Sequence, residues 1–264
     1  MLRRMMGRVG LAAVLACALA GAGYAAGDPD EDNVSMLVIA NHVLADQGVL
    51  DGFGHITVRS TKTPDHYFMA VSRAPAIITR ADIIEFDDKD GSPVRPEKRD
   101  LYSERFIHGE IYRVRPDVKS VVHAHTQAVL PFGLTKTPFR PVVHVAYFLG
   151  FDPVPVFDIR DVAGEDNKML VNTAPLGAGL AKTLGQRSVV LMRGHGMTVV
   201  GGSIQEAVFR AVYTKFNAEV ELETLRLGPP NFLNKYEVNR SERIVRQWEA
   251  WVDEAAAKQR AAPA

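Results

Sequence analysis

The order in which strand-type runs and helical segments follow one another most constrains the fold of this chain. Three short runs rich in β-branched and aromatic residues come in succession at 55–59, 67–72 and 83–86. They follow an amphipathic helical segment at 33–47. Later strand-type runs and helices are mixed without the strict alternation of βαβ units. This order predicts an α/β domain in which a sheet is flanked by helices.

The remaining elements are predicted from the same kinds of signal. A second helix spans 102–115 and closes at Pro116-Asp117, because proline does not continue a helix. Ser203 and Glu206 form a capping box that opens a long helix through about Leu227. The other predicted elements are strands at 120–126, 154–157 and 188–192, and helices at 173–185 and about 234–258.

Length and composition narrow the class of protein. The chain has 264 residues, of which 47% are hydrophobic, and this is enough for one large core. Its 31 basic residues balance 31 acidic ones, which argues against a nucleic-acid binder that works by bulk charge. One cysteine excludes a disulfide framework and a cysteine-based zinc module. No linker or repeat follows residue 32, so a single domain is predicted over 27–264.

The first 26 residues have the layout of a secretory signal peptide. Three arginines precede an apolar run, Leu11–Ala20, and small residues up to Ala26 follow it. The apolar run is too short to span a bilayer comfortably as a permanent helix. We therefore expect residues 1–26 to be removed and the mature chain to be exported to the periplasm.

Removal of this segment would change both the charge and the thiol content. Without Arg3, Arg4 and Arg8, the 31 basic residues become 28 against 31 acidic ones, a net charge of −3. The mature chain would also lose Cys17, its only thiol, which suits an oxidising compartment. A lipid anchor on Cys17 is a minor alternative, because Leu15 fits a lipoprotein cleavage box poorly.

Two histidines on one predicted strand are the sharpest chemical feature. His123 and His125 are separated by one residue, so their side chains would point to the same face, roughly 7 Å apart at Cα. This spacing suits two ligands of one metal ion. The alternative is a pair of hydrogen-bonded histidines without a metal, and an isolated pair favours that alternative.

Two other segments strengthen the metal interpretation. Glu104 is expected in the first turn of the helix at 102–115, with His108 one turn later on the same face. His195 lies between two glycines directly after an apolar strand, where the backbone can approach a ligand closely. Three histidines and a carboxylate make a plausible site for Zn²⁺ or Mn²⁺. Spacing alone does not bring these segments together.

The order of these motifs resembles the class II aldolase/adducin family over roughly residues 33–228. The resemblance rests on Ser103-Glu104, His123-x-His125, Arg193-Gly-His195-Gly and Gly54-His-Ile-Thr-Val-Arg59. It implies an α/β/α sandwich with a largely antiparallel central sheet, often assembled into tetramers with active sites near subunit interfaces. It also implies that His123, His125 and His195 bind a divalent metal, commonly Zn²⁺ or Mn²⁺. Glu104 would be a further ligand or the acid/base.

Departures from the sugar-phosphate aldolases of that family narrow the expected substrate. Those enzymes surround a phosphate with small donors, whereas this chain has Gly54-His55, Ala74-Pro75 and Tyr102-Ser103 at the matching places. Arg73 suits a carboxylate instead, through bidentate pairing. The segments 54–59, 72–75, 104–110 and 140–144 more closely resemble a decarboxylase branch. Its members are metal-dependent and act on hydroxylated aromatic or pyridine dicarboxylates, or on carboxylated ring-cleavage semialdehydes.

The expected function is therefore a divalent-metal-dependent lyase that decarboxylates a hydroxylated carboxylate through a metal-stabilised enolate. Arg73, His55 and Ser103 are expected to bind the small-molecule substrate, and Glu104 or His108 to deliver the proton. Two alternatives stay open: an aldolase or epimerase acting on an unphosphorylated sugar or hydroxy acid, and a non-catalytic interaction module like the adducin head. We expect a homo-oligomer, a tetramer by resemblance, with no nucleic-acid partner and no membrane span in the mature chain.

Overall fold

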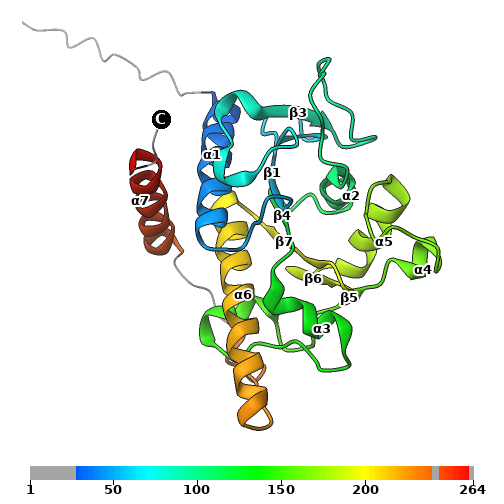
Figure 1. Ribbon diagram of the computed structural model, residues 1–264, viewed down its shortest axis with the longest axis vertical. Coiled ribbons are helices and arrows are strands. Elements are labelled where there is room, and N and C mark those ends of the chain that lie inside the picture. The colour runs from blue at the N-terminus through cyan, green and yellow to red at the C-terminus, as the bar shows by residue number, and fades with distance from the viewer. Residues whose placement is uncertain (1–27, 240–243, 262–264) are drawn as a thin grey trace, which may run out of the picture.

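A computed structural model of the chain describes residues 28–239 and 244–261 (Figure 1). The expected leader at 1–26 lies outside the described residues. A seven-stranded sheet has the order β3-β2-β1-β4-β7-β6-β5. Every pairing is antiparallel except that of β5 with β6. The strands are β1 His55–Arg59, β2 His66–Ala70, β3 Ile83–Asp87, β4 Ser120–Ala124, β5 Val156–Phe157, β6 Val189–Met192 and β7 Gly196–Gly201.

Helices cover the sheet from two sides, which confirms the predicted α/β/α arrangement (Figure 1). On one side α1 contacts β1, α6 contacts β4 and β7, and α7 packs outside α1 and α6. On the other side α2 packs against α5. The helices are α1 Pro29–Asp46, α2 Arg105–Val114, α3 Leu130–Leu134, α4 Arg160–Ala163, α5 Ala174–Leu184, α6 Ile204–Leu227 and α7 Val245–Ala261. Short 3-10 turns lie at Pro75–Ile77, Arg80–Asp82, Gln127–Val129 and His144–Leu149.

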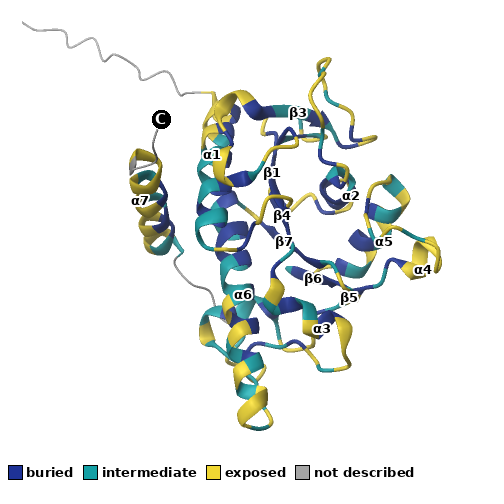
Figure 2. Cartoon of the chain, viewed as in Figure 1, coloured by how far each residue is buried: buried dark blue, intermediate teal, exposed yellow. Residues whose placement is uncertain are grey.

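Helix α1 begins four residues before the predicted segment. Asp28 caps it, because its side chain accepts a hydrogen bond of 3.0 Å from the backbone N–H of Asp30, and Pro29 occupies the first turn. The acidic residues after the leader thus lie at the positive end of the helix dipole. Figure 2 shows the buried faces of α1 and α6 turned towards the sheet.

Helix α2 begins three residues later than predicted, at Arg105. Glu104 precedes the helix with φ −91° and ψ 17°, and its side chain caps no backbone N–H of the helix. The predicted place of Glu104 in the first turn is therefore wrong. Its carboxylate instead reaches across to Val171, whose backbone N–H donates to Oε1 at 2.8 Å. This leaves Oε2 to face the histidines described below.

Strand β7 has no counterpart among the predicted elements, yet it completes the centre of the sheet. It pairs with β4 on one side and β6 on the other. A Cβ at Gly196 would lie only 2.1 Å from the carbonyl oxygen of Ala124, so only glycine allows this approach. The approach brings the β6–β7 turn, which carries His195, against the residue that follows β4, which is His125.

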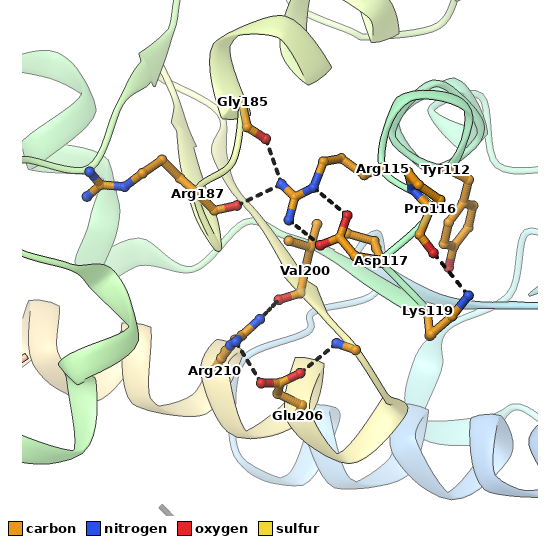
Figure 3. Close-up of polar contacts among 12 residues, drawn as sticks. Tyr112, Arg115, Pro116, Asp117, Lys119, Gly185, Arg187, Val200, Glu206 and Arg210 are labelled. Carbon is orange, nitrogen blue, oxygen red and sulfur yellow. Dashed lines mark hydrogen bonds and ion pairs between the residues drawn. The ribbon is translucent and has the colours of Figure 1, made fainter. Parts of the chain in front are cut away.

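A polar network fixes the opposite end of β4 and β7 (Figure 3). The Ser203 hydroxyl accepts from the N–H of Glu206 at 3.1 Å, and Glu206 accepts from the N–H of Gly202 at 2.6 Å. Ser203 thus caps the helix as predicted, but the second bond of the predicted capping box is replaced, because Glu206 binds the N–H of Gly202 and not that of Ser203. Arg210 joins Glu206 to the carbonyl of Val200, and Arg115 bonds the carbonyl of Gly185. The end of β7 is therefore tied to α6, and the segment between α2 and β4 is tied to the end of α5.

Helix α7 begins later than the predicted 234 and packs on the outer layer. Trp248 and Trp251 are buried, and the Trp251 ring lies 6.0 Å from the ring of Tyr213 in α6. These tryptophans therefore belong to the core. Within the described ranges, no helix combines the length and apolar character that a membrane crossing requires.

Candidate metal centre and the cavity beside it

Four side chains from separate segments converge, with ligand atoms within 4.8 Å of one another: Glu104, His123, His125 and His195. The three histidines meet through their Nε2 atoms. The distance is 3.2 Å between His123 and His125, and 3.1 Å between His125 and His195. Oε2 of Glu104 lies 3.5 Å from His123 Nε2 and 3.3 Å from His195 Nε2. The structure thus brings together the four residues expected to hold a metal.

The outer bonds of two histidines fix where their protons lie. Nδ1 of His123 contacts the carbonyl oxygen of Met197 at 3.1 Å, and Nδ1 of His125 contacts a carboxylate oxygen of Asp51 at 3.3 Å. Both partners only accept, so in the neutral rings Nδ1 carries the proton and Nε2 carries a lone pair. Two lone pairs facing each other at 3.2 Å repel. A cation between them removes that repulsion, so this donor set fits a divalent metal.

The charges around the cluster favour the same conclusion. Burial opposes ionisation of Glu104, but the neighbouring imidazoles of His123 and His195 outweigh it and lower the pKa of Glu104. Burial lowers the pKa of His125, and the neighbouring His123 adds to that effect. For His195, burial acts in the same direction, but the carboxylate of Glu104, which accepts a hydrogen bond from the ring, prevails, and the pKa of His195 is raised. The cluster therefore presents one carboxylate among imidazoles.

The loop before α5 is held against the cluster in an unusual backbone conformation. Met169 has φ +59°, and it is the only non-glycine residue with positive φ in the described part of the chain. The backbone of Met169 hydrogen-bonds the ring of His195, and two residues later Val171 binds Glu104. Such backbone strain persists where surrounding contacts enforce it, and here it orients two of the four candidate ligands.

A cavity of about 550 Å³ opens beside the cluster. The expected substrate-binding residues Arg73, His55 and Ser103 all line it, together with Glu104, His125 and His195. The cavity is completed by Gly52, Phe53, Ser72, Ala74, Leu101, Tyr102 and Leu170. Three of the four residues predicted to bind metal therefore share one cavity with the residues predicted to bind substrate, and His123 lies behind them, fully buried.

Arg73 is held at the wall of this cavity by an aspartate. Its Nη1 donates to both carboxylate oxygens of Asp82, at 3.1 and 2.9 Å, and Thr79 binds the same carboxylate. The Arg73 side chain is still 42% exposed. Among the described residues nothing accepts from its Nε or Nη2. A fork of donors therefore remains for an anionic ligand.

His108 lies elsewhere than expected. It is fully buried, and it does not line the cavity. Its Nε2 lies 2.7 Å from His55 Nδ1, and its Nδ1 lies 2.8 Å from the hydroxyl of Thr57. The expected common helix face with Glu104 is wrong, because Glu104 precedes the helix. Burial lowers the pKa of His108 to about 3, so the ring is neutral.

Sequence reasoning missed the residues that support the site. Asp51, Thr57 and Asp82 were not singled out, although each bonds a candidate site residue. One signal was available for Thr57: it follows His55 by two positions in a predicted strand, so the two side chains share a face. The aspartates carry no such signal, since their contacts depend on loops.

Comparison with known proteins agrees with this geometry. Residues 35–222 match the family described as the class II aldolase and adducin N-terminal domain. The decarboxylase tropJ of Talaromyces stipitatus is 40% identical to this chain, over 81% of this chain and 90% of its own length. A 3,4-dihydroxyphthalate decarboxylase of Terrabacter sp. is 33% identical, over 72% and 80% respectively.

Solved structures share the fold. An aldolase II superfamily protein from Pseudomonas syringae superposes with a TM-score of 0.73, at 19% identity, over 88% of this chain and 95% of that one. L-fuculose 1-phosphate aldolase from Glaciozyma antarctica gives 0.70 at 20% identity, over 86% and 89%. The family match over residues 35–222 and the 40% identity to tropJ show that the protein belongs to the class II aldolase/adducin family.

Proposed function

We propose that this protein is a divalent-metal-dependent lyase that removes CO₂ from a hydroxylated aromatic carboxylate. One observation carries the proposal: the cavity that contains part of the Glu104–histidine cluster also contains Arg73 and a buried histidine, His55. The relatives that are decarboxylases by name support the reaction type. Metal, anion-binding group and proton-bearing groups are what such a reaction requires.

The residues of the cluster have assigned roles. His123, His125 and His195 would hold the ion together with Glu104, and both Zn²⁺ and Mn²⁺ accept such nitrogen and oxygen ligands. When bound, the cation supplies a Lewis acid that stabilises negative charge developing on a substrate oxygen. Asp51 and the carbonyl of Met197 keep two of the rings turned towards the ion.

The walls of the cavity suit a flat carboxylated ring. The free donors of Arg73 would bind the second carboxylate of a dicarboxylate substrate, and Ser103 also lines the cavity. Phe53 and Leu170 supply apolar surface, and the Phe53 ring lies 6.4 Å from that of His125. Phe53 is 74% exposed, which leaves its face available for a ring to stack upon.

Proton delivery falls to groups that face the cavity. Glu104 lines it, whereas His108 lies behind His55. We therefore assign the proton transfer to Glu104: its ionised carboxylate would take the proton of the substrate hydroxyl and pass it to the ring carbon, which keeps the electron pair when CO₂ leaves. His108 would instead position His55, to which it is hydrogen-bonded.

The deciding experiment is a product assay on the purified protein loaded with Zn²⁺ or Mn²⁺. The test substrates are 3,4-dihydroxyphthalate and related hydroxylated dicarboxylates. Unphosphorylated sugars and hydroxy acids are assayed in parallel as substrates of the alternative aldolase or epimerase reaction. We expect CO₂ release in step with loss of the aromatic acid. Aldehyde formation or epimerisation without CO₂ would replace the proposal by the aldolase or epimerase alternative. No turnover of any substrate and no bound metal would favour a non-catalytic module.

We also propose that residues 1–26 direct export to the periplasm and that the mature chain forms a homo-oligomer, a tetramer. The support is the sequence pattern of the leader and the family membership. Fusion of residues 1–30 to a reporter tests export, and a reporter retained in the cytoplasm would contradict it. Light scattering of the mature chain tests the assembly, and a monomer would contradict it.

A further inference from the structure

A chain of buried polar side chains leads from the cavity into the interior beneath the sheet. His55 lines the cavity and is bonded through Nδ1 to His108 Nε2 at 2.7 Å. His108 Nδ1 lies 2.8 Å from the Thr57 hydroxyl, which lies 2.7 Å from the Tyr112 hydroxyl. All four side chains are at most 2% exposed. The proposed metal centre and substrate site use only the first of them.

The direction of the hydrogen bonds in this chain is determined at its inner end. The Tyr112 hydroxyl contacts two groups, the Thr57 hydroxyl and the backbone N–H of Val121, which donates to it. Among the described residues, Thr57 is thus the only acceptor for the Tyr112 proton. If Tyr112 donates to Thr57, then the proton of Thr57 has only His108 Nδ1 as its acceptor. The opposite direction would leave a buried hydroxyl proton without an acceptor, which is costly.

The same direction carries through to the cavity. Because His108 Nδ1 accepts, the proton of its neutral ring lies on Nε2 and is donated to His55 Nδ1. The neutral His55 ring must then carry its own proton on Nε2. That nitrogen makes no hydrogen bond with any described residue, and it belongs to a ring whose centroid lies 5.1 Å from that of His123.

We propose that Tyr112, Thr57 and His108 fix His55 as the tautomer protonated on Nε2, so that His55 acts as a neutral hydrogen-bond donor to an anionic oxygen of the substrate. This assignment rests on the proposed function for the nature of the ligand, a carboxylate. Thr57 and His108 are positioning residues, because they act on the ligand only through His55. A charged His55 would compete with Arg73 for the anion. A neutral His55 donates a hydrogen bond to the anion without adding a second positive charge.

The tautomer is measured directly by long-range ¹H–¹⁵N correlation spectra of the Zn²⁺-loaded protein with ¹⁵N-labelled histidine. His55→Gln assigns the His55 signals. We expect the wild-type His55 signals to show a protonated Nε2 and a bare Nδ1. A wild-type His55 protonated on Nδ1 would overturn the proposal. The spectra need no substrate, so their result does not depend on whether decarboxylation is the reaction.

Variants separate positioning from mere packing. Thr57→Val keeps the shape but removes the hydroxyl, and we expect a mixture of His55 tautomers with kcat/KM lowered on the order of tenfold. His108→Leu should do the same, whereas His108→Gln should restore the wild-type tautomer, since an amide N–H can donate to His55 Nδ1. Thr214→Val is the matched control, because Thr214 is equally buried but its hydroxyl bonds only the Arg210 carbonyl in α6.

The spectra and kinetics of these variants can give three distinguishable results. An unchanged His55 tautomer in folded Thr57→Val and His108→Leu would overturn the positioning role. A changed tautomer with unchanged kcat/KM on a confirmed substrate would overturn the role of His55 as a donor. If no decarboxylation substrate is found but the tautomer shifts as expected, the proposed function fails while the positioning of His55 stands. Circular dichroism spectra matching those of Thr214→Val confirm that the variants are folded.

Discussion

Glu104 and Glu221 are both buried glutamates, and their surroundings are opposite. Glu104 faces His123 and His195, which lower its pKa despite burial. Glu221, in α6, is fully buried, and its Oε1 has no hydrogen-bond partner. Burial raises the pKa of Glu221 to about 8, which the backbone N–H of Arg140 only partly offsets. Burial alone thus neutralises a carboxyl group, and only cationic neighbours or a cation keep it charged.

This difference identifies which of the two buried acids belongs to a binding site. The carboxylate of Glu104 stays ionised and is surrounded by inward-facing imidazole nitrogens. A negative charge with converging lone pairs requires a cation to be stable in the interior. The carboxyl of Glu221 requires none once it holds its proton. Charge, and not burial, therefore distinguishes Glu104 from Glu221.

Replacing each of the two buried glutamates by glutamine separates their roles. Glu104→Gln removes the charge and one candidate ligand, so we expect metal binding to fall sharply and turnover to drop by about a thousandfold or more. Glu221→Gln should leave both near the wild-type level. Metal content after dialysis and CO₂ release are the measurements. Equal behaviour of the two variants would remove the distinction between the sites.

Replacing His123 tests the same cluster from the nitrogen side. His123→Ala should abolish both bound metal and turnover, because it removes a buried ligand whose ring is oriented by the Met197 carbonyl. Thermal unfolding in the presence and absence of added Zn²⁺ shows whether the variant still folds. A folded His123→Ala that retains metal and full activity would reject the cluster as the site.

Replacing Arg73 tests binding of the substrate rather than of the metal ion. Arg73→Ala should raise KM by roughly ten- to a hundredfold with a smaller change in kcat, as expected for the loss of charge-assisted hydrogen bonds of about 1.5–3 kcal/mol. Arg80→Ala is the control, since Arg80 forms an exposed ion pair with Glu31 away from the cavity. Steady-state kinetics measure both. Unchanged KM in Arg73→Ala would remove its assignment.

A further prediction concerns how the free energy of unfolding depends on pH. The pKa of Glu221 is about 8 in the folded chain and about 4.5 when exposed, so between these values the folded chain holds a proton that the unfolded chain has lost. Stability therefore falls as pH rises through this window, by about 1.4 kcal/mol per unit of pKa difference. Urea unfolding gives the free energy of unfolding of Glu221→Gln minus that of wild type. We expect this difference to be more positive at pH 8.5 than at pH 4.5. The exposed Glu165→Gln should show no such trend, and a Glu221→Gln gain independent of pH would contradict this.

Local patterns predicted much of the fold. The strand at His55–Arg59 has the predicted bounds, and the Ser203 cap of α6 lies where the capping box indicated. Strand β7 is not predicted from the sequence, because a glycine stands at each end of its short valine-containing run. The start of α2 was placed too early because nothing local to Ser103 and Glu104 reveals the bond from Val171.

The candidate site was predictable in its ligands and not in their support. His123, His125 and His195 stand in recognisable local patterns, and family resemblance related them to one another. The partnership of His55 and His108 depends on how α2 packs on β1, and the approach of His55 to His123 depends on the pairing of β1 with β4. These are tertiary relations, which neither spacing nor composition encodes.

Metal analysis of the purified wild-type protein, after incubation with Zn²⁺ or Mn²⁺ and removal of free ions, decides whether the Glu104–histidine cluster is a metal centre. We expect one tightly held divalent ion per chain, lost in Glu104→Gln and retained in Glu221→Gln. A wild-type protein that holds no ion, and whose thermal stability does not respond to either metal, would contradict it.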